Sequence, residues 1–404
     1  MTQPHTPWSP EHLRNPHPFY AALRERAPVL PLPGFEGVLA VTRHEDIAPA
    51  LKNPTLFSSR RVAPGLNLPP EVGEQARRFF RTQNNLIASD PPDHTRLRTL
   101  VAKAFTPRLV AEMEPRIRAL ARELIEPLLQ QETFDVMEGL AIPLPVIVIS
   151  EMLGVEPERR QDFKRWSDHV VQMVALSQTR LDPRPILQGL TELHAYLGEV
   201  IERRRREPRD DLLSALVRAA DGFLEVEDLV SFARLLLVAG NETTTNLLGN
   251  ALVSLLRHPE QWARLRATPG LVPATIEETL RYEGPVQALM RMATQDTEIA
   301  GHPVAEGTRL FLLIAAANRD PRRFVEPERF DITRPDPGQL AFGHGVHFCL
   351  GAPLARLEAR VVLEELLPRV GRLAFAPGQE EAIDWGESFL LRGPRRLRLV
   401  AERR

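Results

Sequence analysis

The sequence predicts a mostly α-helical fold with a minor β portion, and two patterns in its 404 residues carry that prediction. Apolar residues recur at spacings of three and four over long segments, which is the period of an amphipathic helix. Short alternating segments bounded by glycine or proline turns lie between them and indicate strands. Because no linker-like stretch or internal repeat divides the chain, we expect one helix-rich domain over residues 1–404, with small N-terminal and C-terminal β regions.

Each element follows from its local pattern. The strand candidates are Val38–Thr42, Thr297–Ile299, Arg309–Ile314 and Arg396–Val400. The helix candidates are Leu97–Phe105, Ala111–Gln130, Ile186–Arg205, Val226–Arg257, Pro273–Glu283 and Ala352–Leu367. The segment Ser58–Asp90 is rich in Pro, Gly, Asn and Arg, which predicts a long irregular connection of the kind that often forms a functional lid.

Composition excludes several classes of function. Hydrophobic residues make up 43% and charged residues 26%, ordinary values for a globular protein, and the net charge of -2 gives no basic field for binding nucleic acid. The first thirty residues hold six prolines and no apolar run, so neither a signal peptide nor a membrane anchor is predicted. We therefore expect a cytoplasmic protein with no nucleic-acid or membrane partner.

The only cysteine, Cys349, lies in the glycine-spaced stretch Ala341-Phe342-Gly343-His344-Gly345-Val346-His347-Phe348-Cys349-Leu350-Gly351. A single cysteine excludes an intrachain disulfide and metal sites built from several thiolates. A lone cysteine is often a small buried hydrophobe. Just before a helix, however, the dipole and free amide groups favour the thiolate, which is a ligand for iron. The loop fails as a dinucleotide motif because Phe348 replaces the third glycine of Gly-x-Gly-x-x-Gly.

The longest predicted helix, Val226–Arg257, is about 48 Å long at 1.5 Å per residue. Its apolar flanks are interrupted by Gly240-Asn241-Glu242-Thr243-Thr244-Thr245-Asn246. An interior glycine costs about 1 kcal/mol, and threonine hydroxyls that bond to helix carbonyls distort the helix. A solvated surface explains the polar residues but not Ala239-Gly240, so a functional interruption is the stronger hypothesis.

Together these motifs resemble the cytochrome P-450 family. The family's haem-binding signature, Phe-Gly-x-Gly-x-His-x-Cys-x-Gly, has all six fixed positions here, at Phe342, Gly343, Gly345, His347, Cys349 and Gly351. Its Ala-Gly-x-Asp/Glu-Thr motif matches Ala239, Gly240, Glu242 and Thr243. The resemblance runs from Asp90 through Arg360, with the motifs in the family's order, and implies a cytochrome P-450 fold with the long central helix over the haem.

The resemblance implies a haem-thiolate monooxygenase that inserts one oxygen atom from O2 into a small organic substrate, using two electrons. Its cofactor would be haem b (iron protoporphyrin IX), with the Cys349 thiolate as the metal ligand. Ala239 and Gly240 would lie at a local widening of the central helix that makes room for dioxygen. Glu242 and Thr243 would organise water and deliver protons.

The resemblance also assigns charged residues to the haem and the fold. His94, Arg98, Arg291 and His347 match the family's contacts to the haem propionates, which need cationic or hydrogen-bonding partners. Glu278 and Arg281 stand three residues apart, and an isolated pair of this kind is by default an exposed one. The family's order, with Pro327-Glu328-Arg329-Phe330 following, instead implies a buried structural network of Glu278, Arg281 and Arg329.

Electrons are expected from separate proteins, a ferredoxin and its reductase, because the sequence shows no flavin or ferredoxin module. Lys103, Arg108, Arg356 and Arg360 are candidates for a basic docking patch, or for an ordinary solvated surface. A monomer is expected.

Two alternative functions stay open at this point. The first is a peroxide-driven haem-thiolate peroxygenase, against which the retained Glu242 and Thr243 argue. The second is a non-catalytic haem ligand-binding protein, which would need a signalling domain that the sequence does not show.

The substrate is not identified by the sequence. By position in the family, the windows expected to supply the pocket are Ser58–Leu86, Phe163–Leu193, Val286–Met290 and Phe389-Leu390. They mix apolar residues with arginines, a composition compatible with fatty acids, terpenoids and macrolides.

Overall fold

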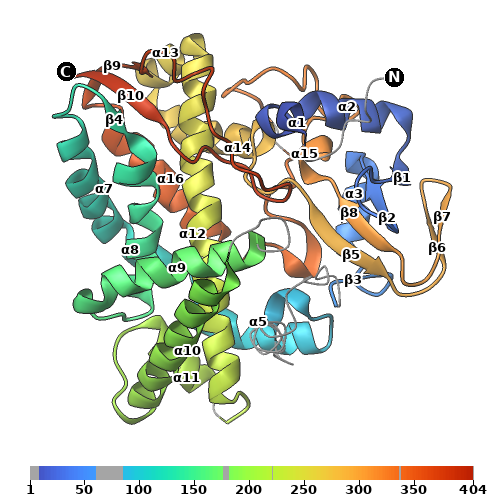
Figure 1. Cartoon of the computed structure of the whole chain (residues 1–404), viewed down its shortest axis with the longest axis horizontal. Helices are drawn as coiled ribbons and strands as arrows, with labels where there is room; N and C mark the ends of the chain where they lie inside the picture. The colour runs from blue at the N-terminus through green and yellow to red at the C-terminus, as the bar shows by residue number, and fades with distance from the viewer. Residues whose placement is uncertain (1–8, 61–84, 176–181, 221, 336–337, 404) are drawn as a thin grey trace. The chain divides into compact units, whose positions relative to one another are not determined.

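The computed structural model of the chain describes residues 9–60, 85–175, 182–220, 222–335 and 338–403 (Figure 1). Helices dominate, as predicted. The α-helices are α1 (Pro10–Arg14), α2 (His17–Arg26), α3 (His44–Lys52), α5 (Asp93–Ala104), α6 (Pro107–Glu112), α7 (Glu114–Leu128), α8 (Pro143–Met152), α9 (Arg160–Ala175), α10 (Pro183–Arg206), α11 (Leu212–Ala220), α12 (Val226–Arg257), α13 (Pro259–Ala267), α14 (Val272–Tyr282), α15 (Ile314–Ala317) and α16 (Ala352–Leu366). A π-helical turn, η2, covers Met137–Ala141, and 3-10 turns include η5 at Gly345–His347.

The strands form three small sheets. The largest has the order β1-β2-β8-β5-β3, in which β2 and β8 run parallel and the other neighbours antiparallel. The others have the orders β4-β10-β9 and β6-β7. Their bounds are β1 (Val29–Pro31), β2 (Val38–Val41), β3 (Phe57–Ser58), β4 (Phe134–Asp135), β5 (Leu289–Ala293), β6 (Thr297–Ile299), β7 (His302–Val304), β8 (Arg309–Leu312), β9 (Val370–Phe375) and β10 (Arg398–Arg403).

The predicted elements are largely confirmed, and the structure shifts several boundaries, such as that of the C-terminal strand, which is Arg398–Arg403 rather than Arg396–Val400. The expected helix at 111–130 is two helices, α6 and α7, which meet at Met113. The expected strand at 309–314 ends at Leu312, and the chain then turns into α15. Most of the predicted lid at 58–90 lies outside the described residues.

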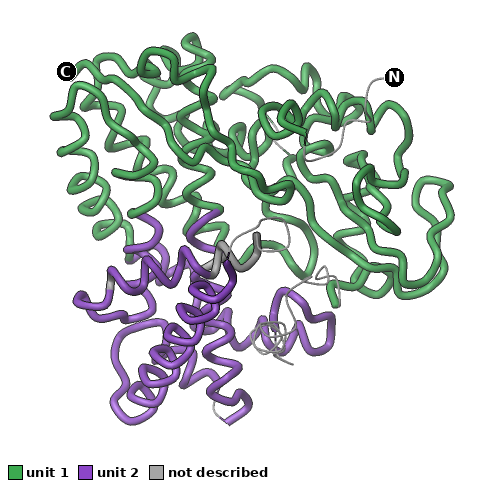
Figure 2. The backbone as a smooth tube through the Cα atoms, viewed as in Figure 1, with its two compact units in different colours: residues 1–62, 113–143, 243–404 green, residues 63–112, 144–242 purple. Residues whose placement is uncertain are grey.

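The chain divides into two compact units (Figure 2). The first comprises residues 1–62, 113–143 and 243–404, and holds all the strands just named. The second comprises residues 63–112 and 144–242 and is helical where it is described, with α5, α9, α10 and α11. Helix α12 contributes its first half to the second unit and its second half to the first. That residues 1–404 fold as one domain stays a prediction.

The core of the first unit lies on both faces of its five-stranded sheet. One cluster joins α3 to the sheet through Ile47, Leu51, Leu310 and Leu312. The other joins α2 to the opposite face through Tyr20, Leu23, Ala40 and Phe311. Successive residues of β8, Leu310 and Phe311, thus enter different clusters, as the alternation of a strand requires. The sheet is buried on both faces and gives β5 a fixed position.

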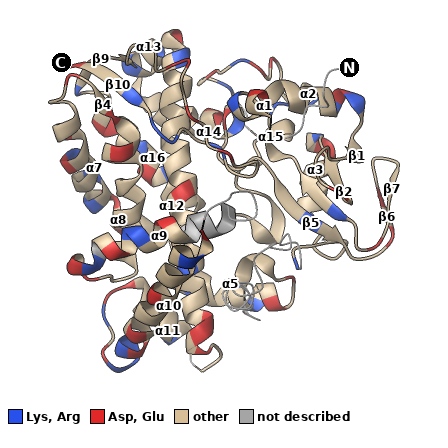
Figure 3. Cartoon of the chain, viewed as in Figure 1, with Lys and Arg blue, Asp and Glu red and all other residues tan. Residues whose placement is uncertain are grey.

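Charged residues also hold the first unit together. Figure 3 shows basic and acidic residues interspersed along α7. Arg118 on α7 bonds to Glu365 at 2.9 Å and Glu364 at 2.6 Å, both on α16, while Arg122 bonds to Glu365 at 2.8 Å. Burial alone would raise the pKa of Glu365, but the hydrogen bonds from Arg122 and Arg118 outweigh burial and lower this pKa to about 2. The network fixes α7 to α16, the helix that follows Cys349.

The lowered pKa predicts an acid-dependent loss of stability. Because the folded state favours the ionised Glu365, its contribution is fully present above about pH 4.5 and is lost as the pH falls toward 2. We expect Glu365→Gln to lower the melting temperature at pH 7 and to flatten its decline between pH 5 and pH 3, as measured by circular dichroism. Glu402→Gln, in an exposed pair with Arg372, is the control and should leave both unchanged. An unaltered decline in Glu365→Gln would contradict this role.

Candidate active site

Cys349 is presented by a closed loop directly before α16. The amide of Cys349 donates to the carbonyl of Phe342 at 2.9 Å, and the amide of Gly343 donates to that of Leu340 at 2.8 Å. Helix α16 then begins at Ala352, with Gly351 as its N-cap. The cysteine side chain is half-buried. The loop thus places the sulfur near a helix N-terminus, where the dipole favours a thiolate.

Glycine is needed in this loop because the backbone passes close to α3. Gly345 has a φ of +70°, and a Cβ built on it would lie 2.8 Å from the carbonyl oxygen of Leu51 and 3.0 Å from Cα of Lys52. A larger residue would push the loop away from α3. At Gly351 the same test puts a Cβ only 4.0 Å from Sγ of Cys349, so glycine keeps this side of the sulfur open.

Arg356 braces the loop from α16. Its guanidinium carbon lies 4.4 Å from the ring centroid of Phe342, and its Nε bonds to Glu277 on α14 at 2.5 Å. Two more arginines proposed for a docking patch, Arg108 and Arg360, also form ion pairs, with Glu112 and Glu114. Carboxylates therefore already balance these three arginines, which favours the alternative of an ordinary charged surface.

Helix α12 is α-helical throughout Val226–Arg257, and the predicted local widening at Ala239-Gly240 stays a prediction. The Thr245 hydroxyl donates to the carbonyl of Ala141 in η2 at 2.9 Å, so this threonine forms a bond outside the helix. Ala239 is nevertheless exposed, and a Cβ on Gly240 would meet no atom within 4 Å. The small side chains thus leave space beside the helix at Gly240.

The polar interruption of α12 is not a solvated surface. Within the second unit, Nδ2 of the buried Asn241 donates to Oγ of Ser167 on α9 at 2.7 Å. Thr244 and Thr245 are also buried. The neighbouring Glu242 and Thr243 are half-buried, which leaves the acid and the alcohol between two anchored positions.

The remaining predicted site residues come from both units. Arg291 on β5 is buried in the first unit, and its guanidinium donates to the carbonyl of Met290 at 2.7 Å. His347, in η5 of the same unit, is half-buried. His94 and Arg98 lie one turn apart on α5 in the second unit. Burial, followed by the charge of Arg98, lowers the pKa of His94, which favours a neutral imidazole over a cation.

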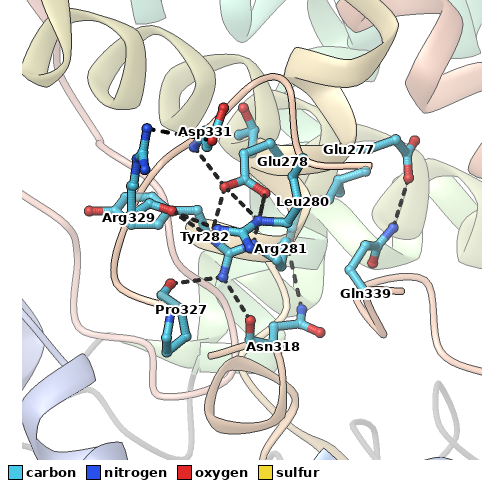
Figure 4. A network of polar contacts seen from close by, with 12 residues as sticks. Glu277, Glu278, Leu280, Arg281, Tyr282, Asn318, Pro327, Arg329, Asp331 and Gln339 are labelled. Carbon is cyan, nitrogen blue, oxygen red and sulfur yellow. Dashed lines mark hydrogen bonds and ion pairs between the residues drawn. The ribbon is translucent and has the colours of Figure 1, made fainter. Parts of the chain in front are cut away.

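A buried ion pair joins several segments inside the first unit. Figure 4 shows the Arg281 guanidinium directed at the carboxylate of Glu278 and at three backbone carbonyls. The Nε–Oε2 distance is 2.8 Å, and the carbonyls are those of Asn318, Pro327 and Arg329 at 2.8–3.0 Å. Both side chains are fully buried. This confirms the predicted burial of Glu278 and Arg281.

The predicted role of the Arg329 side chain was wrong. Its guanidinium is half-exposed and pairs with Glu326 and Asp331, while only its carbonyl reaches Arg281. Arg334 instead supplies the second guanidinium, with Nε 3.2 Å from Oε2 of Glu278. The chain turns between Pro327 and Arg334, and sequence order does not determine which arginine points inward from such a turn.

One residue of the predicted pocket windows, Phe389, is a core residue, and another window lies mostly outside the described residues. Phe389 is buried in the core of the first unit, with its ring 5.6 Å from that of Phe311 and 5.4 Å from that of Phe35. Its ring therefore belongs to the core of this unit, and its contribution to a substrate pocket stays a prediction. Of the Ser58–Leu86 window, residues 61–84 lie outside the described residues.

Sequence reasoning missed an acid on α16, Glu358. Burial raises its pKa to about 8, which favours the protonated carboxyl at neutral pH, and among the described residues its Oε2 has no hydrogen-bond partner. A sequence signal existed, since Glu358 stands next to Leu357 and Ala359 in the run Leu357–Val362.

Comparisons with known proteins agree with this architecture. The family model for cytochrome P450 matches residues 15–268 and 270–395. The vitamin D(3) 25-hydroxylase of Pseudonocardia autotrophica is 41% identical, over 98% of this chain and 96% of the relative. The chain therefore belongs to the cytochrome P450 family. It is accordingly a monooxygenase, an oxidoreductase.

Solved structures show the same fold. Cytochrome P450 CYP109Q5 from Chondromyces apiculatus has a TM-score of 0.88 and 45% identity, covering 99% of this chain and 98% of that one. CYP109E1 from Bacillus megaterium, solved in complex with testosterone, has a TM-score of 0.83 and 35% identity, covering 96% and 99%. Within the part of the chain that the structure describes, no helix has the length and apolar character needed to span a bilayer.

The inward position of Arg334 predicts a contrast between two arginine variants. We expect Arg334→Ala to lower the free energy of unfolding by about 2–3 kcal/mol, because it removes a guanidinium from the buried Glu278. Arg329→Ala, the control, should cost less than about 0.5 kcal/mol, because the carbonyl that Arg281 uses remains. Urea denaturation followed by circular dichroism measures both. Equal losses would refute the assignment.

Proposed function

We propose that Cys349 binds haem b through its thiolate and that this chain is a haem-thiolate monooxygenase acting with external redox partners. The single observation that carries the proposal is the loop itself. It holds the only cysteine, half-buried, at the N-terminus of α16, between glycines whose missing Cβ atoms leave room. The proposal takes residues 1–404 as a single domain, in keeping with the continuous run of α12 from one unit into the other.

The residues of this chain fit a bound haem. A flat macrocycle with two propionates needs a thiolate, close backbone approach and cationic or hydrogen-bonding partners at its edge. In the first unit, Cys349 supplies the thiolate, Phe342, Gly343 and Gly351 shape the loop, and Arg291 and His347 are the partners. By resemblance to the family, the proposal also includes His94 and Arg98 on α5 and the small pair Ala239-Gly240 on α12.

When bound, the haem supplies the two-electron activation of O2, so that one oxygen atom enters the substrate and the other leaves as water. The chain's own residues manage charge and protons. The N-terminus of α16 and the loop amides stabilise the negative sulfur. Glu242 exchanges protons with water, and the Thr243 hydroxyl donates a hydrogen bond and passes a proton on. The overall reaction takes two protons and two electrons for each product and each water.

The same residues favour this function over its alternatives. Hydrogen peroxide already carries the two electrons and two protons that O2 would have to receive, so a peroxide-driven enzyme has less need of an acid beside an alcohol. Here Glu242 and Thr243 are both present, with Asn241 and Thr245 anchored on either side. Electrons would come from a separate ferredoxin and ferredoxin reductase.

The relatives support a substrate class. We propose a large, mostly apolar polycyclic molecule of the steroid or secosteroid type. The 41% identical relative is a vitamin D(3) 25-hydroxylase, and the structure of CYP109E1, 35% identical, contains testosterone. Testosterone is therefore the probe of choice.

The thiolate assignment predicts one spectral signature. We expect the reduced, haem-loaded protein to show with carbon monoxide the red-shifted absorption of sulfur-ligated iron, because the thiolate donates electron density to iron. Cys349→His, which offers an imidazole in its place, should bind haem and lose that band. Glu402→Gln, at an exposed residue paired with Arg372, is the control and should keep the red-shifted band. Absence of the band from the wild-type protein would end the proposal.

The proton-delivery assignment predicts uncoupling. With ferredoxin, its reductase, NADH and testosterone, we expect Thr243→Ala to lower product per NADH by about tenfold and to raise released hydrogen peroxide, because a general acid step typically contributes a factor of 10² or more. Thr244→Ser, a buried neighbour that keeps its hydroxyl, should stay coupled. Full coupling in Thr243→Ala would refute the role of Thr243. Turnover with peroxide but never with ferredoxin would favour the peroxygenase.

A further inference from the structure

The second half of α12 carries a row of polar side chains into the interior of the first unit. Asn246, Asn250 and Ser254 follow one another at a spacing of four, so they lie on one side of the helix. Their exposed fractions are 9%, 0% and 2%. Burying a polar group costs free energy unless it is hydrogen-bonded, so the contacts of the most buried member, Asn250, show what the row does.

The Asn250 side-chain amide joins α12 to two other parts of the chain. Its Nδ2 donates to the carbonyl of Glu283 at 2.7 Å and to the carbonyl of Arg392 at 3.0 Å. Two carbonyl acceptors require two N–H donors, and an amide nitrogen supplies both. Aspartate has the same shape as asparagine but, when ionised, no donor at all.

The two acceptors belong to segments that also bind each other. The amide of Arg392 donates to the carbonyl of Pro285 at 2.8 Å, and the amide of Gln287 donates to that of Leu390 at 2.9 Å. The Arg392 side chain bonds to the carboxylate of Glu283 at 2.6 Å. Asn250 therefore fixes α12 to an assembled pair of segments, one of which leads into β5 and Arg291.

Close backbone packing also limits the rotation of α12 about its axis against the two segments that contain Glu283 and Arg392. A Cβ built on Gly393 would overlap the side-chain amide of Asn246, and one built on Gly249 would lie 2.7 Å from Cγ of Pro394. The Asn250 hydrogen bonds and these contacts lie on neighbouring turns of the helix. A rotation of α12 would break both.

Thr243 shares this side of the helix. It precedes Asn250 by seven residues, which is close to two full turns and about 10 Å along the axis. We propose that Asn250 is a positioning residue: its two hydrogen bonds set the rotation of α12 and thereby the direction of the Thr243 hydroxyl. The inference rests on the proposed function in that Thr243 delivers protons there.

The test compares Asn250→Asp, which has no donor when ionised, with Asn250→Ser, which keeps one donor, in the haem-loaded protein. The control is Val253→Ala, which removes buried apolar atoms from the same helix and spares both carbonyls. Hydrogen–deuterium exchange is followed in peptides over residues 239–247, 283–287 and 390–392. Product and hydrogen peroxide per NADH are measured with testosterone, ferredoxin and ferredoxin reductase.

We expect exchange in all three peptides to rise about tenfold in Asn250→Asp and less in Asn250→Ser, because local opening no longer breaks these bonds. Product per NADH should fall about threefold or more in the same order, with peroxide rising, whereas Val253→Ala melts at a lower temperature and stays coupled. If Asn250→Asp fails to fold, the comparison of Asn250→Ser with the wild-type protein and Val253→Ala tests the role of Asn250.

Two results would overturn the inference. One is unchanged exchange at residues 239–247 in the Asn250 variants, and the other is equal loss of coupling in Val253→Ala. If the wild-type protein makes no product from testosterone, the proposed substrate class fails, and the exchange at residues 239–247 still decides the role of Asn250.

Discussion

The buried ion pair of Glu278 and Arg281 is the interaction on which the first unit depends. Arg281 donates to the carbonyl of Asn318, and Oδ1 of Asn318 accepts from the amide of Leu340 at 2.8 Å. The carbonyl of Leu340 then accepts from Gly343 in the cysteine loop. A continuous series of hydrogen bonds thus runs from the ion pair to the loop that presents Cys349. Because Glu278 and Arg281 are buried, removing either one would leave the charge of the other unpaired and would strongly destabilise the fold.

Arginine side chains make many of the contacts that join the elements of this chain. The chain has 51 basic and 53 acidic residues, and lysine occurs only at Lys52, Lys103 and Lys164. The planar guanidinium makes several directed hydrogen bonds at once, as Arg281 does to Glu278 and three carbonyls and Arg118 does to three carboxylates. The charged residues therefore join elements to one another, and the near-zero net charge reflects internal pairing.

Helix α12 shows how a polar stretch is tolerated inside a long helix. Glycine and three threonines in succession are poor helix formers, yet the helix is regular. Asn241, Thr245 and Asn250 each donate to a group outside the helix, on α9, η2 and the ends of two loop segments. Tertiary hydrogen bonds thus offset the weak local propensity, and they also set the direction of the residues between them.

The sequence by itself determined the fold class, the bounds of α12 and the identity of the cysteine loop, because helical period and motif spacing are local properties. It also predicted that Glu278 and Arg281 are buried, although only through family resemblance. Tertiary structure decided that Arg334 rather than Arg329 turns inward, that Phe389 enters the core, and that Asn250 binds two distant carbonyls. Each of these depends on which segments meet in space, and a side chain's direction in a turn or a core is set by partners far away in the sequence.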